Sequence, residues 1–361
     1  MRRKRSERRA AKRANIAPPL RGRINASEIK LPEFSADGTP VSFKTLGEWA
    51  EAGWGGEALA AFDRGDYFAD GNVRLSAADP YRAGKRVWVF RPVLDEPAEP
   101  IELTVVEQTQ RYLVVEKPHG MATIPRGSHV ANTVTVAARR QFQNDLLAAA
   151  HRLDLETAGL VLLTKAPEYR AKYQSIFQRR EIRKTYYAAA PILDEFADGG
   201  AHEVNLPLFR PHGQIWVSVF APESQNGQEF LAGGGKVWNS RTEVKLVREI
   251  GDNKFSAVER SLSGHRDFQN LPARWGIYEL RPHSGYLHQL RVTMLHFGAP
   301  IFGDPLYPRW MTKAEEAARA FPLQLLAREL EFADPYTGER LHFVSHQRLA
   351  LDICGDALSG E

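Results

Sequence analysis

The chain has 361 residues, of which 48 are Lys or Arg and 44 are Asp or Glu, and it contains a single Cys. One thiol, Cys354, excludes an internal disulfide and a cysteine-based zinc site. No apolar run approaches the roughly 18 residues that a membrane span requires, so we expect no membrane partner. The first residues lack the apolar stretch of a secretory signal, which favours a cytoplasmic location.

Positive charge is concentrated at the start of the chain. Residues 1–23 contain ten basic residues and one acid, Glu7. Such a segment has no apolar face with which to fold, so we expect a disordered basic arm. Segregated positive charge favours a nucleic-acid partner over a merely solubilising tail.

Residues 24–100 are predicted to form a small N-terminal domain. The stretch 42–71 indicates one or two short helices, and 71–92 indicates two strands joined by a turn. The segment around Asp70 and Gly71 loosely resembles the second half of an S4-type RNA-binding module, which makes a degenerate S4-like domain our interpretation. The acidic, proline-containing segment 94–102 is predicted to be a linker.

Residues 101–361 are predicted to form one larger domain in which strands and helices mix. Strands are expected over 103–108, 112–118, 159–166 and 184–192, and helices over 133–150 and 167–180. The inward face of the second helix is expected to carry Tyr169, Tyr173, Ile176 and Phe177. Loops are expected over 225–236 and 251–275. This pattern predicts an α+β fold.

Motifs of cofactor-dependent chemistry are missing from the sequence. The Gly-rich run at 233–235 leads into Lys236 and Val237, without the Ser or Thr of a phosphate-binding loop. The histidines do not fall into a metal-ligand spacing. We therefore expect side-chain chemistry with no cofactor and no metal.

The segment His151-Arg152-Leu153-Asp154 lies directly before a buried strand. A carboxylate at the mouth of such a strand sits on a rigid element and can be positioned for catalysis. Read alone, this segment favours an Asp154 that caps a turn and pairs with Arg152 over a catalytic one.

Further motifs surround this segment in a fixed order. Lys117-Pro118-His119-Gly120 precedes it, and Lys184-Thr185-Tyr186-Tyr187-Ala188 follows it. Ser284-Gly285-Tyr286-Leu287-His288-Gln289-Leu290-Arg291 and Pro300-Ile301-Phe302-Gly303-Asp304-Pro305-Leu306-Tyr307 come next. Taken together, these motifs resemble those of the ribosomal large subunit pseudouridine synthase A-type (RluA-like) family across residues 104–345.

The resemblance implies a fold and an activity. The fold would be a mixed, mainly antiparallel sheet with flanking helices and a cleft for RNA. The enzyme would be an isomerase that breaks the N1–C1′ bond of a uridine and rejoins the uracil through C5, with no cofactor or metal. The RNA partner would be ribosomal rather than transfer RNA, and we expect a monomer.

The resemblance also implies residue roles. Asp154 matches the catalytic Asp, Arg291 its basic partner, and Tyr186 the ring that stacks on the target uracil. Arg152 matches the Arg that enters the RNA stack when the uridine flips out. Further RNA-binding or base-flipping candidates are His151, Lys117, Lys184, His288 and Gln289.

Two neighbouring residues in these motifs depart from the family pattern. Tyr286 and Leu287 replace the family's Arg and its neighbour, which removes one charge from the expected RNA path. We interpret the chain as a divergent member with retained catalysis. The alternative is a catalytically lapsed RNA-binding or ribosome-assembly factor on the same fold, and the presence of Asp154, Tyr186 and Arg291 argues against it.

A basic run follows the candidate catalytic segment. Its members are Lys165, Arg170, Lys172, Arg179, Arg180, Arg183 and Lys184. Such a run is ordinarily a solvated helix face, but beside these motifs we expect it to contact RNA phosphates.

Overall fold

A computed structural model describes residues 17–35, 38–91, 101–127, 129–211, 214–232, 235–250, 274–319 and 321–353. The chain forms two compact units, one made of residues 1–102 with 124–145 and the other of residues 103–123 with 146–361. Most of the predicted arm (1–16), most of the predicted linker (94–100) and Cys354 lie outside the described residues.

The smaller unit is built on a four-stranded antiparallel sheet in the order β1-β4-β2-β3. Its strands are β1 (Ser27–Lys30), β2 (Tyr67–Ala69), β3 (Val73–Arg74) and β4 (Arg86–Val89). Helices α2 (Leu46–Trp54) and α3 (Gly56–Asp63) contribute Trp49, Ala50 and Phe62 to one buried cluster with these strands. The S4-like interpretation of this unit stays a prediction.

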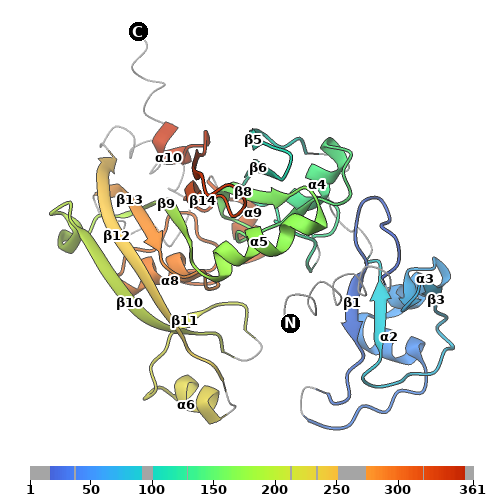
Figure 1. The fold of residues 1–361 in the computed structure, drawn as a ribbon. Helices are drawn as coiled ribbons and strands as arrows, with labels where there is room; N and C mark the ends of the chain where they lie inside the picture. Colours follow the sequence, from blue (N-terminus) through green and yellow to red (C-terminus); the bar gives the residue numbers. More distant parts are fainter. Residues whose placement is uncertain are drawn as a thin grey trace. The chain divides into compact units, whose positions relative to one another are not determined.

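The larger unit contains an eleven-stranded sheet (Figure 1) in the order β11-β10-β12-β13-β9-β14-β8-β6-β5, with β15 beside β14 and β7 beside β8. Its earlier strands are β5 (Val105–Gln108), β6 (Tyr112–Lys117), β7 (Ala148–Ala149), β8 (Ala158–Thr164), β9 (Ile182–Pro191) and β10 (Ala201–Phe209). The later strands are β11 (Ser218–Val219), β12 (Trp238–Ile250), β13 (Trp275–Pro282), β14 (Leu325–Ala333) and β15 (Arg340–Val344).

Every strand pair in this sheet is antiparallel except β8 with β14, which run parallel. The predicted α+β class and the mixed, mainly antiparallel sheet are therefore confirmed. The remaining described elements of this unit are α5 (Pro167–Gln178), η1 (Asp194–Phe196), α6 (Gln225–Ala232), α8 (Gln289–His296), α9 (Lys313–Ala317) and α10 (Ala350–Ile353).

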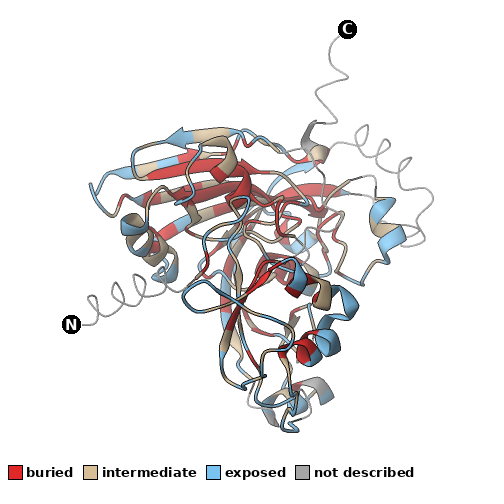
Figure 2. Cartoon of the chain, turned by 90° about the vertical axis from the view of Figure 1, so that its right-hand side faces the viewer, coloured by how far each residue is buried: buried red, intermediate tan, exposed pale blue. Residues whose placement is uncertain are grey.

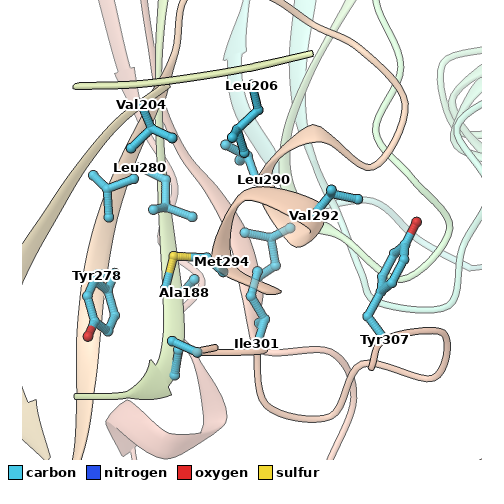
Figure 3. Close-up of a cluster of buried hydrophobic side chains, with 14 of the residues drawn as sticks. Ala188, Val204, Leu206, Tyr278, Leu280, Leu290, Val292, Met294, Ile301 and Tyr307 are labelled. Atoms are coloured by element: carbon cyan, nitrogen blue, oxygen red, sulfur yellow. The ribbon is translucent and has the colours of Figure 1, made fainter. Parts of the chain in front are cut away.

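Two helices pack on the sheet and form separate buried clusters with it. Tyr173 and Ile176 of α5 are buried with β6, β8, β14 and β15, and Tyr169 and Phe177 lie at the edge of that cluster, as the helical spacing predicts. Helix α8 supplies Leu290 and Met294 to the other cluster, where they meet Leu206 of β10 and Leu280 of β13 (Figure 3). The middle of the sheet is buried (Figure 2), which gives both helices a rigid support.

Two sequence expectations about local structure were wrong. The helix expected over 133–150 ends earlier, since α4 spans Val134–Gln141 and Gln143 adopts a left-handed φ of 49° before β7 begins. The loop expected over 225–236 contains the helix α6. Most of the loop expected over 251–275 lies outside the described residues.

None of the described helices is both long and apolar enough to cross a membrane. In the described ranges, no group of three or more His, Cys, Asp or Glu side chains could hold a metal ion.

Candidate active site

One face of β9 carries two of the predicted site residues. Alternation along a strand puts Ile182, Lys184, Tyr186 and Ala188 on the same face. Ile182 belongs to the buried cluster of α5, and Ala188 belongs to that of α8. Lys184 and Tyr186 therefore lie between the two helix-covered regions of that sheet face.

The loop that carries Asp154 is fixed by contacts on either side of that residue. The Thr123 hydroxyl donates to the carbonyl of Leu153 and accepts from its N–H, both at 3.1 Å. The Lys117 ammonium donates to the carbonyl of Leu155 at 2.7 Å, and the His119 ring nitrogen lies 2.7 Å from the carbonyl oxygen of Glu156. The backbone around Asp154 is thus held while its own carboxylate stays free to act.

The Asp154 carboxylate lies beside a buried guanidinium. Oδ2 of Asp154 is 3.9 Å from Nη1 of Arg291, whose side chain is 5% exposed, while that of Asp154 is 28% exposed. The Asp154 carboxylate is therefore paired with a buried cation and is still accessible to a substrate.

Arg291 is itself fixed by Asp304, in a bidentate pair with N–O distances of 2.7 and 2.6 Å. The same Asp304 accepts hydrogen bonds from the backbone N–H groups of Leu306 and Tyr307. Burial acts to lower the pKa of Arg291, but the hydrogen bonds and charge of Asp304 outweigh it and raise the pKa. The guanidinium therefore remains charged and immobile beside Asp154.

Tyr307 contacts Arg291 and two further segments of the larger unit. The guanidinium carbon of Arg291 lies 5.1 Å from the centre of the Tyr307 ring. The Tyr307 hydroxyl lies 3.0 Å from Nδ1 of His288 and donates to the carbonyl of Val217. One ring thus joins Arg291, the loop before α8 and the segment that leads into β11.

The Tyr186 hydroxyl lies within range of the charge of the same carboxylate. Burial, and after it the negative charge of Asp154, raises the pKa of the Tyr186 hydroxyl. The ring therefore stays neutral near Asp154 and offers an apolar face to a bound base.

The family of this chain follows from its similarity to known proteins. Residues 111–296 match the family model described as RNA pseudouridylate synthase. The chain belongs to this family. It is therefore an RNA pseudouridine synthase, which is an isomerase.

Two bacterial relatives illustrate how far the similarity extends. The Dual-specificity RNA pseudouridine synthase RluA of Escherichia coli K12 is 30% identical over 254 residues, which are 68% of this chain and 94% of that protein. The Ribosomal large subunit pseudouridine synthase D of Pseudomonas aeruginosa is 26% identical over 260 residues, which are 69% of each chain. The predicted family resemblance is therefore confirmed.

A solved structure has the same fold at lower identity. Human RNA Pseudouridylate Synthase Domain Containing 1 superposes with a TM-score of 0.50 at 19% identity, covering 74% of this chain and 98% of that one.

Arg152 and His151 of this pseudouridine synthase lie in different environments. Arg152 is exposed, and within the described residues it has no ion-pair or hydrogen-bond partner. His151 accepts a hydrogen bond at Nε2 from the N–H of Leu162 and stacks on Phe177 at 4.3 Å. Burial lowers the pKa of His151 to about 3, so this half-buried ring stays neutral. RNA contact by His151 stays a prediction.

Two of the residues predicted to contact RNA are buried. Lys117 is fully buried, so it cannot reach RNA here and instead bonds the carbonyls of Pro118 and Leu155. Gln289 is 3% exposed and bonds Ser284, Tyr286 and Thr242. Both residues hold backbone segments of the site. RNA contact by Lys184 and His288, which are half-buried, stays a prediction.

Lys117 gives the synthase a predictable dependence of stability on pH. Burial lowers the pKa of Lys117 from 10.5 to about 7. Between these values the unfolded chain binds one more proton than the folded chain, so the free energy of unfolding should rise with pH, by at most about 1.4 kcal/mol per unit. Below about pH 7 both states are protonated and this contribution is flat.

Urea unfolding between pH 6 and 10 tests this prediction. Lys117→Met should lose the rise that the native chain shows above pH 7. The matched control Lys313→Met removes an exposed lysine and should give a curve parallel to that of the native chain. Parallel curves for native chain and Lys117→Met would contradict the prediction.

Several members of the basic run have partners within the protein. Arg179 pairs with Glu181 at 2.8 Å, and Arg183 pairs with Glu331 at 3.4 Å. Lys172 donates to the carbonyl of Pro335, and Arg170 to that of Leu146. RNA contact by this run stays a prediction, and Arg180 is a member that has no carboxylate within ion-pair distance among the described residues.

Sequence reasoning missed three residues of the site. Asp304 belongs to one of the matched motifs, but its neighbours are typical of a turn, and nothing in them indicates a bond to Arg291. Arg319 joins the carboxylate of Glu156 at 3.0 Å to the carbonyl of Gly303 at 2.7 Å, and nothing in its local sequence marks it. Thr123 likewise has no local signal.

Proposed function

We propose that this pseudouridine synthase modifies a specific uridine in a structured RNA, ribosomal rather than transfer RNA, with Asp154 as the catalytic carboxylate. The observation that carries the proposal is the position of Asp154. It is partly exposed, and it lies 3.9 Å from a guanidinium fixed by Asp304.

The chemistry requires one group to act on the ribose–base unit. The N1–C1′ bond breaks, the uracil turns, and C5 bonds to C1′. C5 then loses its proton, and N1 ends protonated. Asp154 acts either as a nucleophile at C1′ or as a base at C2′. Both roles require an ionised carboxylate, and the buried guanidinium of Arg291 lies beside that of Asp154.

The glycosidic bond of a stacked base is out of reach, so the uridine must leave its helix. Arg152 is exposed two residues before Asp154 and is unpaired within the described residues. A side chain so placed can fill the space that the flipped base leaves. Tyr186 can then stack on the extruded uracil, because a neutral aromatic ring binds any base face.

The printed names of the relatives support an RNA substrate of this kind. One relative is named as dual-specific, and another is named for the ribosomal large subunit. We favour ribosomal RNA because the second name specifies it.

Pseudouridine mapping tests the function. RNA from cells with and without the protein should differ at one or a few positions, and those positions should lie in ribosomal RNA. A difference confined to transfer RNA would overturn the ribosomal assignment. A purified protein that binds RNA but produces no pseudouridine in any RNA would instead support the lapsed RNA-binding factor.

A further inference from the structure

The segment before α8 departs from the family pattern at Tyr286 and Leu287, and the structure gives each a different role. Leu287 packs at the edge of the buried cluster around α8. The ring of Tyr286 lies parallel to that of Trp238, the first residue of β12, with an interplanar angle of 10° and a centroid distance of 5.8 Å. Both rings are half-buried, so each keeps surface that a ligand can reach.

A guanidinium completes this aromatic pair. Nη2 of Arg180 donates to the Tyr286 hydroxyl at 3.2 Å, and its guanidinium carbon lies 6.0 Å from the ring centre. Within the described part of the chain, no carboxylate lies within ion-pair distance of Arg180, in contrast to Arg179 and Arg183 beside it. Arg180 thus brings an uncompensated positive charge to the residue that replaces the family's Arg.

The backbone at Arg180 shows that this position is specialised. It follows the end of α5, where its N–H bonds the carbonyl of Phe177, and it has a φ of 60°. Glycine is the usual residue in this left-handed position after a helix, because a Cβ there is unfavourable. Strained non-glycine residues of this kind gather at functional sites.

Lys184 connects this position to the candidate active site. Its ammonium donates to the carbonyl of Ser284, at the start of the segment that contains Tyr286, at 2.8 Å. Burial, and then the charge of Arg180, lowers the pKa of Lys184 to about 8, which is consistent with two neighbouring cations. Lys184 lies on the same face of β9 as Tyr186, the ring that we expect to stack on the uracil. It therefore lies between the segment of Tyr286 and the candidate active site.

We propose that Arg180, Tyr286 and Trp238 form a binding site for one nucleotide of the RNA that flanks the target uridine. The base stacks on the accessible face of the aromatic pair, and the phosphate binds Arg180. Aromatic rings stack on any base, and a guanidinium forms charge-assisted hydrogen bonds with phosphate. This inference rests on the proposed function for its substrate class.

Binding of a labelled ten-nucleotide oligouridylate, followed by fluorescence anisotropy, tests the site without knowledge of the modified position. Arg180→Gln should weaken binding and reduce the slope of log affinity against log salt by about one. The control Arg179→Gln makes the same charge change one residue away, at an arginine already paired with Glu181, and should change the affinity less than twofold.

The aromatic half of the site is tested in the same assay. Trp238→Ala should weaken binding by roughly 5- to 100-fold, whereas Trp238→Phe should retain most of the affinity. Equal losses for Arg180→Gln and Arg179→Gln, or native affinity in a folded Trp238→Ala, would overturn the inference. Failure of the proposed function would appear separately, as binding without pseudouridine formation by the native chain.

Discussion

Replacing Asp154 with Asn should reduce pseudouridine formation by roughly 1000-fold or more, because the amide can act neither as a nucleophile nor as a base. Asn has nearly the same shape, and the loop is held through the backbone of Leu153 and Leu155, so the fold should persist. The reaction replaces the hydrogen on C5 of the uracil. Release of tritium from RNA labelled at that carbon, under single-turnover conditions, therefore measures the chemical step.

A second aspartate provides the matched control. Asp194 is exposed in the same unit, and Asp194→Asn makes the same chemical change away from Arg291. It should release tritium at the native rate. Native activity in a correctly folded Asp154→Asn would remove Asp154 from the mechanism and leave the family membership untouched.

Gly159→Ala should destabilise the larger unit by about 3 kcal/mol or more, or prevent it from folding. Gly159 has a φ of 112°, and a Cβ there would lie 2.2 Å from the carbonyl oxygen of Ala327. That oxygen belongs to the backbone of β14, which pairs with β8 at this point. Two central strands would have to separate, so the clash cannot be relieved by rotating a side chain. Chemical denaturation measures the loss.

Gly298→Ala separates the steric effect from backbone strain. Gly298 also has a positive φ, of 81°, but a Cβ there would meet nothing within 4 Å. It should cost only the strain of a left-handed alanine, about 1–2 kcal/mol. If both variants are destabilised equally, the close approach of β8 and β14 is not what requires glycine. Because β8 begins four residues after Asp154, Gly159→Ala should also lower the activity of any folded fraction.

The sequence by itself determined the fold class and the family. Strand β8 was recognisable because a strand buried on both faces has a continuous apolar run. Helix α5 was recognisable because its buried side chains recur at a spacing of three and four residues. The ordered motifs around Asp154 identified the chemistry, since catalysis fixes residue types at a site more strictly than packing does. In contrast, the end of α4 and the presence of α6 depend on weaker local preferences, and both predictions failed.

Only the tertiary structure decided which of the motif residues face the site and which support it. Lys117, His151 and Gln289 have charged or polar side chains, so the sequence suggested RNA contacts, but all three bond internal backbone or side-chain groups. Asp304 bonds Arg291, which lies 13 residues before it in the chain. Arg319 bonds Glu156, which lies 163 residues before it. Burial and long-range pairing arise when the strands assemble into the sheet, and for that reason no local pattern records them.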